Sequence, residues 1–179
     1  VQRIERLITD YSQMLKDEVA LSKEKMKKIN IEPIIQSVVD DYNSIYKVKR
    51  DIKINYENDG KKEYSINGIE NRIEQMIANL LDNSISFTEK GGNIIVNISI
   101  TSNRKITVKI IDEGQGFKEK DTSKIFRRFY SNRPDKFGEH SGLGLNIVKN
   151  LVELHDGKIV ASNRPNNKGA IMEISFPSM

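Results

Sequence analysis

The chain has 179 residues, of which 37% are apolar, enough for one domain of ordinary size plus an appendage. Its formal net charge of +4 comes from 29 basic and 25 acidic residues interleaved along the sequence, so nucleic acid is not the expected partner. The absence of cysteine excludes disulfide frameworks and thiolate metal sites, and no apolar run has the length of a membrane span.

Residues 1–28 carry apolar side chains at helical spacing among many charges, which predicts an amphipathic helix. The charge density of KDEVALSKEKMKK favours one half of a helical hairpin or coiled coil over a surface helix packed on its own domain. Asn30 to Pro33 interrupt the pattern, so we expect a linker near residues 23–32. The predicted domains are 1–29, a helix and linker, and 30–179.

The rest of the chain alternates between helical and strand patterns. Helices are predicted over residues 33–46, 69–87 and 143–154, and strands over 52–56, 63–66, 93–101, 105–112, 158–163 and 170–176. The two long alternating runs at 93–101 and 105–112 predict a hairpin. This order predicts an α+β sandwich with a mixed, largely antiparallel sheet and helices on one face.

Two asparagines on the predicted helix 69–87 are candidate metal ligands. Asn79 and Asn83 are four residues apart and share a face, with Phe87 one further turn along. Amide oxygens are hard ligands, and Mg²⁺ is normally held by one or two protein oxygens plus phosphates and water. The alternative is a pair of solvated polar residues.

A glycine-punctuated strand end follows in IIDEGQGF. The carboxylate of Asp112 can accept a hydrogen bond from an exocyclic amine such as that of adenine, and Gly114 and Gly116 let the backbone approach the ring. An ordinary turn or a calcium loop has a similar appearance. The run lacks the further acidic positions of an EF-hand, which argues against calcium.

A third element, SGLGL, opens the helix predicted at 143–154. Backbone amides at a helix start bind phosphate, and Ser141 is the candidate N-cap. A plain helix entrance is the alternative. The residues involved are Ser141, Gly142, Leu143, Gly144 and Leu145.

About 25 polar and basic residues separate the second and third elements, which is long for a structureless connection. We expect a lid that Phe126 and Phe129 anchor while a cation reaches the phosphates. The basic residues of this stretch include Arg127, Arg128, Arg133 and Lys136.

These elements, in this order, resemble the catalytic and ATP-binding domain of bacterial sensor histidine kinases, within the wider gyrase, chaperone and mismatch-repair (GHKL) ATPase superfamily. NLLDNSISFT resembles the N box and IFRRFY the F box of this family. DEGQG resembles the first glycine box and SGLGL the second glycine box, while NKGA stands where a third glycine turn would fall. RLITDYS and FYSNRPDKFGEHSGLGL resemble the alphaproteobacterial envelope-sensing kinases of the ChvG type.

The resemblance implies a Bergerat-fold α/β sandwich with ATP bound through its adenine at Asp112. It implies Mg²⁺ on Asn83 with help from Asn79, phosphates at the second glycine box, and Phe87 and Phe129 beside the nucleotide. Many members carry lysine and tyrosine where this chain has Ser86 and Phe87. The missing phosphate contact therefore falls to another cation, of which Arg128, Arg133 and Lys136 are candidates.

The implied function is transfer of the ATP γ-phosphate to a histidine on a dimerisation hairpin, whose acceptor helix precedes Val1, for relay to a response regulator. The resemblance further implies a homodimer and a cytoplasmic domain of an inner-membrane protein. Hydrolytic relatives carry a glutamate where this chain has Asn79, and because an amide is no general base, fast ATP hydrolysis is not expected. The alternatives are a GHKL-type ATPase or serine kinase, and a nucleotide-sensing dimerisation module.

Overall fold

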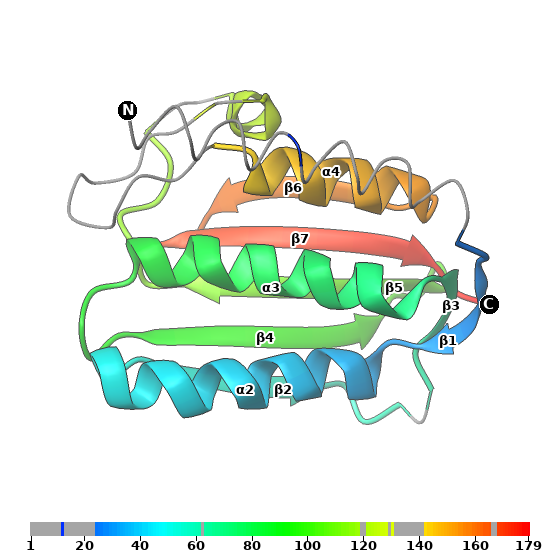
Figure 1. The fold of residues 1–179 in the computed structure, drawn as a ribbon, viewed down its shortest axis with the longest axis horizontal. Coiled ribbons are helices and arrows are strands. Elements are labelled where there is room, and N and C mark those ends of the chain that lie inside the picture. Colours follow the sequence, from blue (N-terminus) through cyan, green and yellow to red (C-terminus); the bar gives the residue numbers. More distant parts are fainter. Residues whose placement is uncertain are drawn as a thin grey trace.

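The structure, a computed structural model, consists of a layer of helices on one face of a five-stranded sheet (Figure 1). It describes residues 12, 24–61, 63–118, 121–128, 130, 142–165 and 168–179. The helices are α2 (Glu32–Arg50), α3 (Glu70–Phe87) and α4 (Gly144–Leu154). All three confirm predicted helices, whereas nearly all of the helix expected over 1–28 lies outside the described residues. In the described part, no helix is both long and apolar enough to cross a bilayer.

The sheet is largely antiparallel, as predicted. In spatial order its strands are β2 (Lys53–Asn58), β4 (Asn93–Ile100), β5 (Lys105–Asp112), β7 (Ala170–Pro177) and β6 (Lys158–Asn163). Among the strands that the structure describes, only the β2–β4 pair is parallel, and β4–β5 is the predicted hairpin. A connection between parallel neighbours must cross over, and here α3 lies between β2 and β4 in the chain.

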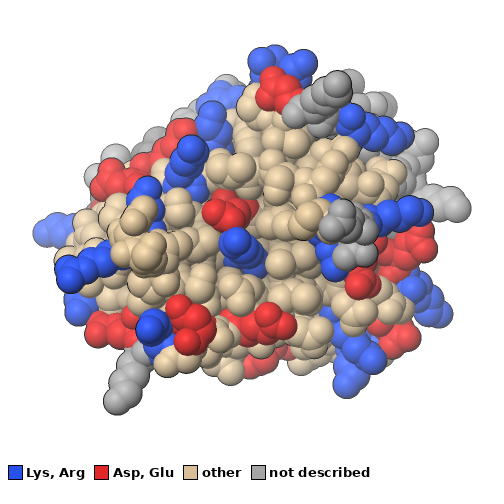
Figure 2. All heavy atoms as spheres, turned by 180° about the vertical axis from the view of Figure 1, so that it is seen from behind, with Lys and Arg blue, Asp and Glu red and all other residues tan. Residues whose placement is uncertain are grey.

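Alternation along the strands separates a buried face from an exposed one. Ile110 of β5 lies opposite Val96 of β4 and Met172 of β7, and all three are fully buried under the helices. On the other face Lys109 and Glu173 are also opposite each other and pair at 3.1 Å. Figure 2 shows this face, on which basic and acidic side chains are interspersed over the part that the structure describes.

A second sheet joins two short strands, β1 (Lys27–Asn30) and β3 (Ser65–Gly68), in antiparallel pairing. The sequence predicted the end of a helix and a linker where β1 lies, and placed the later strand at 63–66. The first expectation is wrong because a four-residue strand is too short to show a period of two, whereas the predicted strand is present but begins two residues later. Ile29 and Ile66 lie opposite each other and are buried, which explains why this segment pairs.

The long connection after β5, which the sequence predicts as a lid, contains a short 3₁₀-helix, η1 (Thr122–Phe126). The carboxylate of Asp121 caps its start by accepting a hydrogen bond from the Ser123 amide. The Thr122 hydroxyl donates to the Ala161 carbonyl of β6 at 2.7 Å. Phe126 is buried, as its expected anchoring role requires, while Phe129 lies outside the described residues.

His155 has a structural role at the end of α4. The ring is 3% exposed, its Nδ1 donates to the Leu151 carbonyl at 2.7 Å, and its Nε2 accepts from the Ile69 amide at 3.1 Å. Burial lowers the pKa of His155, so the ring is held neutral. It therefore ties the end of α4 to the start of α3.

Candidate nucleotide-binding site

Asp112 is the last residue of β5 and extends the buried row of that strand. Because side chains alternate, Asp112 points to the same side as Val108 and Ile110, toward the helices, and it is only 2% exposed. In Figure 1 β5 ends at the same side of the molecule as the C-terminal end of α3. A buried carboxylate thus stands where the N-box helix meets the first glycine box.

Backbone amides hold one oxygen of this carboxylate. Oδ1 of Asp112 accepts from the Gly114 amide at 2.9 Å and from the Ala170 amide at 3.1 Å. Burial raises the pKa of Asp112, and these two amides, the Ser84 hydroxyl and Arg164 only partly oppose that rise. Both bonds end on Oδ1, so Oδ2 remains the oxygen able to accept from a ligand.

The first glycine box packs against the last turn of α3. A Cβ on Gly114 would lie 2.9 Å from both the Cβ and the carbonyl oxygen of Phe87, and 3.0 Å from Asp112 Oδ1. Only glycine fits there, and this close approach brings Phe87 and Asp112 together. Gly116 has a φ of +74° and lies against Asn163, so it too has no space for a side chain.

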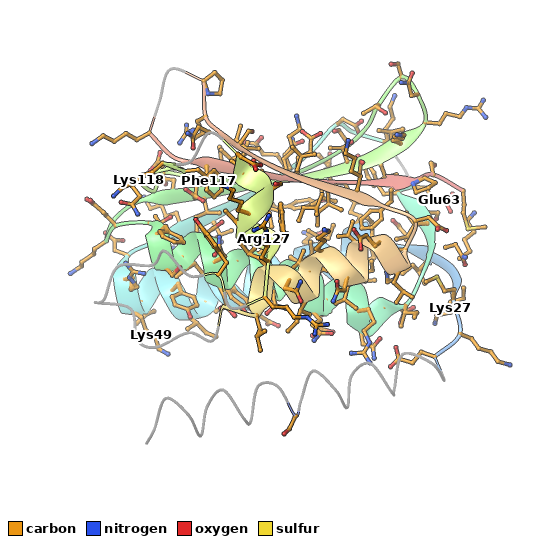
Figure 3. The ribbon with its side chains drawn as sticks, turned by 90° about the horizontal axis from the view of Figure 1, so that it is seen from above. Lys27, Lys49, Glu63, Phe117, Lys118 and Arg127 are labelled. Carbon is orange, nitrogen blue, oxygen red and sulfur yellow. The ribbon has the colours of Figure 1, made fainter. Side chains whose placement is uncertain are left out.

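Asn163, at the end of β6, is a site residue that the sequence analysis missed. Its Oδ1 accepts from the Phe117 amide at 2.6 Å, and its Nδ2 donates to the Phe117 carbonyl at 2.9 Å. These two hydrogen bonds hold the backbone at Phe117, which directly follows the first glycine box, against the end of β6. Figure 3 shows Phe117 and Lys118 at the end of the molecule opposite Lys27 and Glu63 of the small-sheet region. The turn-rich sequence around Asn163 gave no signal for this contact.

The turn between β6 and β7 is the weak third glycine turn of the sequence analysis, and it reaches Asp112 directly. Gly169 has a φ of +126° and lies against the Asp112 carbonyl oxygen, where a Cβ would collide. Arg164 Nη1 donates to the same carbonyl at 3.3 Å. The amide of Ala170 then reaches the carboxylate, so three residues of this turn position one aspartate.

The two asparagines lie on α3 as predicted, and one of them reaches the start of α4. Asn83 is 8% exposed and Asn79 is half-buried. Asn79 Oδ1 lies 3.9 Å from the position of a Cβ on Gly144, so the N box and the second glycine box are adjacent. The described residues include no cluster of three or more His, Asp or Glu side chains suited to a metal. Amide oxygens beside phosphates fit Mg²⁺, which is rarely caged by protein alone.

The start of α4 differs from the prediction in its cap. Leu143 occupies the N-cap position without a side-chain hydrogen bond, and Gly142 precedes it with a φ of +70°. The N-cap assignment of Ser141 is wrong because the helix begins three residues later, and Ser141 itself lies outside the described residues. Leu143 is buried and Leu145 packs against the core, so their side chains are not available to a ligand. These two residues can contact a ligand through their backbone amides.

The F-box segment contacts α4 through Asn146, another residue that the sequence analysis missed. Asn146 Nδ2 donates to the Phe126 carbonyl at 3.0 Å, while its buried Oδ1 has no hydrogen-bond partner among the described residues. Arg128 follows η1 and is exposed. The structure therefore brings the F box to the helix that opens with the second glycine box.

Arg50 at the end of α2 fixes the end of α3, a contact that no sequence pattern predicted. Its guanidinium donates to the Ile85 carbonyl at 2.6 Å and to the Thr88 carbonyl at 2.7 Å. The last turn of α3 has no basic residue of its own. Arg50 thus satisfies carbonyls that the helix leaves open and offsets the negative end of its dipole.

Comparison with known proteins identifies the family of this chain. Residues 68–179 match the family model of the histidine kinase-, DNA gyrase B- and HSP90-like ATPases. The sensor protein ChvG of Agrobacterium fabrum is 33% identical over 183 aligned residues, covering 98% of this chain and 30% of ChvG. The adaptive-response sensory kinase SasA of Rippkaea orientalis is 30% identical, covering 96% of this chain and 43% of the relative. The chain thus spans less than half the length of these relatives.

Solved structures agree with the fold. The catalytic domain of the histidine kinase ThkA is 25% identical with a TM-score of 0.74, covering 87% of this chain and 97% of that domain. A structure of ThkA in complex with the response regulator protein TrrA matches with the same TM-score at 23% identity, covering 98% of this chain and 49% of that one. The chain belongs to the histidine kinase-, DNA gyrase B- and HSP90-like ATPase family, among relatives that are sensor histidine kinases.

Proposed function

We propose that this chain is the ATP-binding catalytic domain of a sensor histidine kinase, which transfers the γ-phosphate of ATP to a histidine on a separate helical hairpin. The observation that carries the proposal is the buried carboxylate of Asp112, held by two backbone amides through Oδ1 alone. A buried carboxylate is costly unless its oxygens are hydrogen-bonded, and the second oxygen of Asp112 suits the exocyclic amine of adenine.

The residues of α3 and α4 would hold the triphosphate. Asn83, with help from Asn79, supplies amide oxygens for Mg²⁺, which when bound neutralises charge on the transferring phosphate. The uncapped amides at the start of α4 lie beside Asn79 and face the same ligand. Arg128 is the described cation proposed to contact the phosphates, while Phe87 lines the adenine end.

The protein contributes positioning to this reaction and no covalent step. The acceptor histidine attacks the γ-phosphorus, the bond from that phosphorus to the β,γ-bridging oxygen breaks, and ADP leaves. Asn79 cannot remove a proton from water, so hydrolysis without an acceptor should be slow. This favours a kinase over a hydrolytic relative.

Partners and location extend the same proposal. A response regulator is the proposed recipient of the phosphoryl group, as the ThkA complex with TrrA supports by similarity. We further propose that the parent protein is a homodimer, with this domain on the cytoplasmic side of an inner membrane. Co-purification of differently tagged copies of the parent protein tests the dimer.

The test of the kinase activity adds a histidine-bearing dimerisation hairpin in trans, with labelled ATP and Mg²⁺. We expect an acid-labile, base-stable phosphate on the hairpin, which is lost in Asp112→Ala and Asn83→Ala. An acid-stable product would favour the serine kinase, and rapid phosphate release without transfer the ATPase. ATP binding without either reaction would favour the nucleotide-sensing module.

A further inference from the structure

Ser84 carries a buried hydroxyl that lies close enough to the Asp112 carboxylate to lower its pKa but makes no hydrogen bond of good geometry to a described residue. The residue is fully buried on α3, and its Oγ has no hydrogen-bond partner of acceptable geometry among the described residues. Serine inside a helix ordinarily bonds the carbonyl one turn earlier. Its neighbours follow that rule, since the Ser86 hydroxyl donates to the Asn83 carbonyl at 2.6 Å and Thr88 Oγ1 to the Ser84 carbonyl at 2.8 Å.

The unused hydroxyl lies beside the adenine carboxylate. Ser84 is three residues before Phe87, so the two side chains share a face of α3. A Cβ built on Gly114 would lie 2.9 Å from the Phe87 Cβ and 3.0 Å from Asp112 Oδ1. Phe87 and Asp112 are therefore close neighbours. Ser84 also contributes to lowering the pKa of Asp112 against the effect of burial. Ser84 and Asp112 therefore border the same buried space at the end of β5.

The two groups have complementary hydrogen-bonding capacities. An ionised carboxylate only accepts, whereas a serine hydroxyl donates one hydrogen bond. Adenine presents a matching pair on adjacent atoms, because its N6 amine donates and its ring N1 accepts. Guanine presents the reverse pair, an accepting O6 and an N1–H, and its O6 would face the carboxylate.

We propose that Ser84 is a specificity-determining residue that donates to N1 of adenine, directly or through one ordered water, while Asp112 accepts from N6. This inference rests on the proposed function, in which ATP binds at Asp112. It assigns the second hydrogen bond of adenine recognition to a side chain of the N-box helix. Leaving a buried hydroxyl unpaired in the free protein is costly, and the ligand removes that cost.

The test compares ATP with 1-deaza-ATP, which lacks the N1 acceptor, in calorimetric titrations of the wild type and Ser84→Ala. We expect 1-deaza-ATP to bind the wild type roughly three- to tenfold more weakly than ATP, the range of one hydrogen bond. Ser84→Ala should bind ATP more weakly by a similar factor and no longer distinguish the two nucleotides. 7-Deaza-ATP, which keeps N1, should behave like ATP in its response to the substitution.

Two controls separate this role from a structural one. Ser86→Ala removes a hydroxyl already bonded within the helix and should keep the wild-type preference for ATP. Ser84→Ala should change the free energy of unfolding little, because alanine favours helix and the lost hydroxyl makes no hydrogen bond of good geometry with the described residues of the free protein.

An equal penalty for 1-deaza-ATP in the wild type and Ser84→Ala would overturn the role of Ser84 and leave ATP binding intact. Failure of the wild type to bind any of the nucleotides would instead overturn the proposed function, and this inference with it. The two results are distinguishable in one set of titrations, since the full double-mutant cycle includes the ATP measurement.

Discussion

Gly169 lies directly against the carbonyl oxygen of Asp112, so the start of β7 leaves no space for a side chain beside the end of β5. Its φ of +126° is also one that residues with a Cβ rarely adopt. The third glycine turn therefore borders Asp112 and the proposed nucleotide site, even though the sequence shows it only as NKGA.

Gly169→Ala should lower the free energy of unfolding by about 1–3 kcal/mol from backbone strain, and by more from the collision. ATP affinity should fall as well, because Asp112 must shift. Chemical denaturation and calorimetry measure the two effects. Gly60→Ala is the matched control, since Gly60 has a φ of +74° in open space and should cost only about 1 kcal/mol. Equal effects for both variants would contradict the close-packing argument.

Asp112→Asn separates stability from function. Asparagine keeps an oxygen for the two backbone amides and removes the buried charge, so stability at neutral pH should equal or exceed that of the wild type. ATP affinity should fall roughly tenfold or more, the effect of losing a charged hydrogen bond. Calorimetry and denaturation at pH 7 measure both quantities.

The raised pKa of Asp112 also predicts how the stabilities of the wild type and Asp112→Asn depend on pH. An acid whose pKa is raised by folding stabilises the native state most at low pH, and that contribution is lost as the pH rises through the raised pKa. The difference in free energy of unfolding between Asp112→Asn and the wild type should therefore shrink as the pH is lowered through the raised pKa of Asp112. An advantage that grew on acidification would contradict a raised pKa.

Arg50→Ala should destabilise the protein by about 1.5–3 kcal/mol, because two helix carbonyls lose a charged donor. It should also weaken ATP binding, since the last turn of α3 carries Phe87 and follows Asn83. Denaturation and calorimetry measure both, with Lys49→Ala on the exposed side of α2 as the control. Figure 3 shows Lys49 pointing away from the layer of α3. Equal changes in the free energy of unfolding and ATP affinity for the two variants would show that Arg50 does not stabilise the end of α3.

The sequence predicted the large elements well because they are long and periodic. The 18-residue helix α3 and the eight-residue strands β4 and β5 each show several repeats of their pattern. Four-residue β1 shows no repeat, and its pairing with β3 depends on a partner far along the chain. Local patterning cannot reveal such a contact.

The site shows the same division. Asp112 and Gly114 were found because a strand end followed by glycines is a local signal. Asn163 and Arg50 act through contacts with distant segments, and their own neighbours look like an ordinary turn or helix end. Gly169 was noted only through the family resemblance, and its contact with Asp112 is also between distant segments. Such contributions depend on how β6, β7 and α2 pack around α3 and β5, which tertiary structure alone determines.

His155 should make stability depend on pH through its two ring nitrogens. In the folded protein Nε2 accepts from the Ile69 amide and Nδ1–H donates to Leu151, so a second proton would break the bond to Ile69. The folded pKa is lowered, while the unfolded ring protonates near its ordinary value of about 6.5. Stability is therefore fully present above that value and falls as the pH drops from it toward the lowered pKa.

Two measurements check this. An NMR titration of His155, made in His140→Gln to leave one histidine signal, should show no protonation near pH 6.5 while the protein is folded. His155→Phe keeps a ring against Phe176 but leaves the Ile69 amide unpaired, so it should cost about 1–3 kcal/mol at pH 7.5. The free energy of unfolding of His155→Phe should no longer depend on pH just below 6.5. An NMR titration in which His155 protonates near its ordinary pKa in the folded protein would contradict its proposed role in joining α3 and α4.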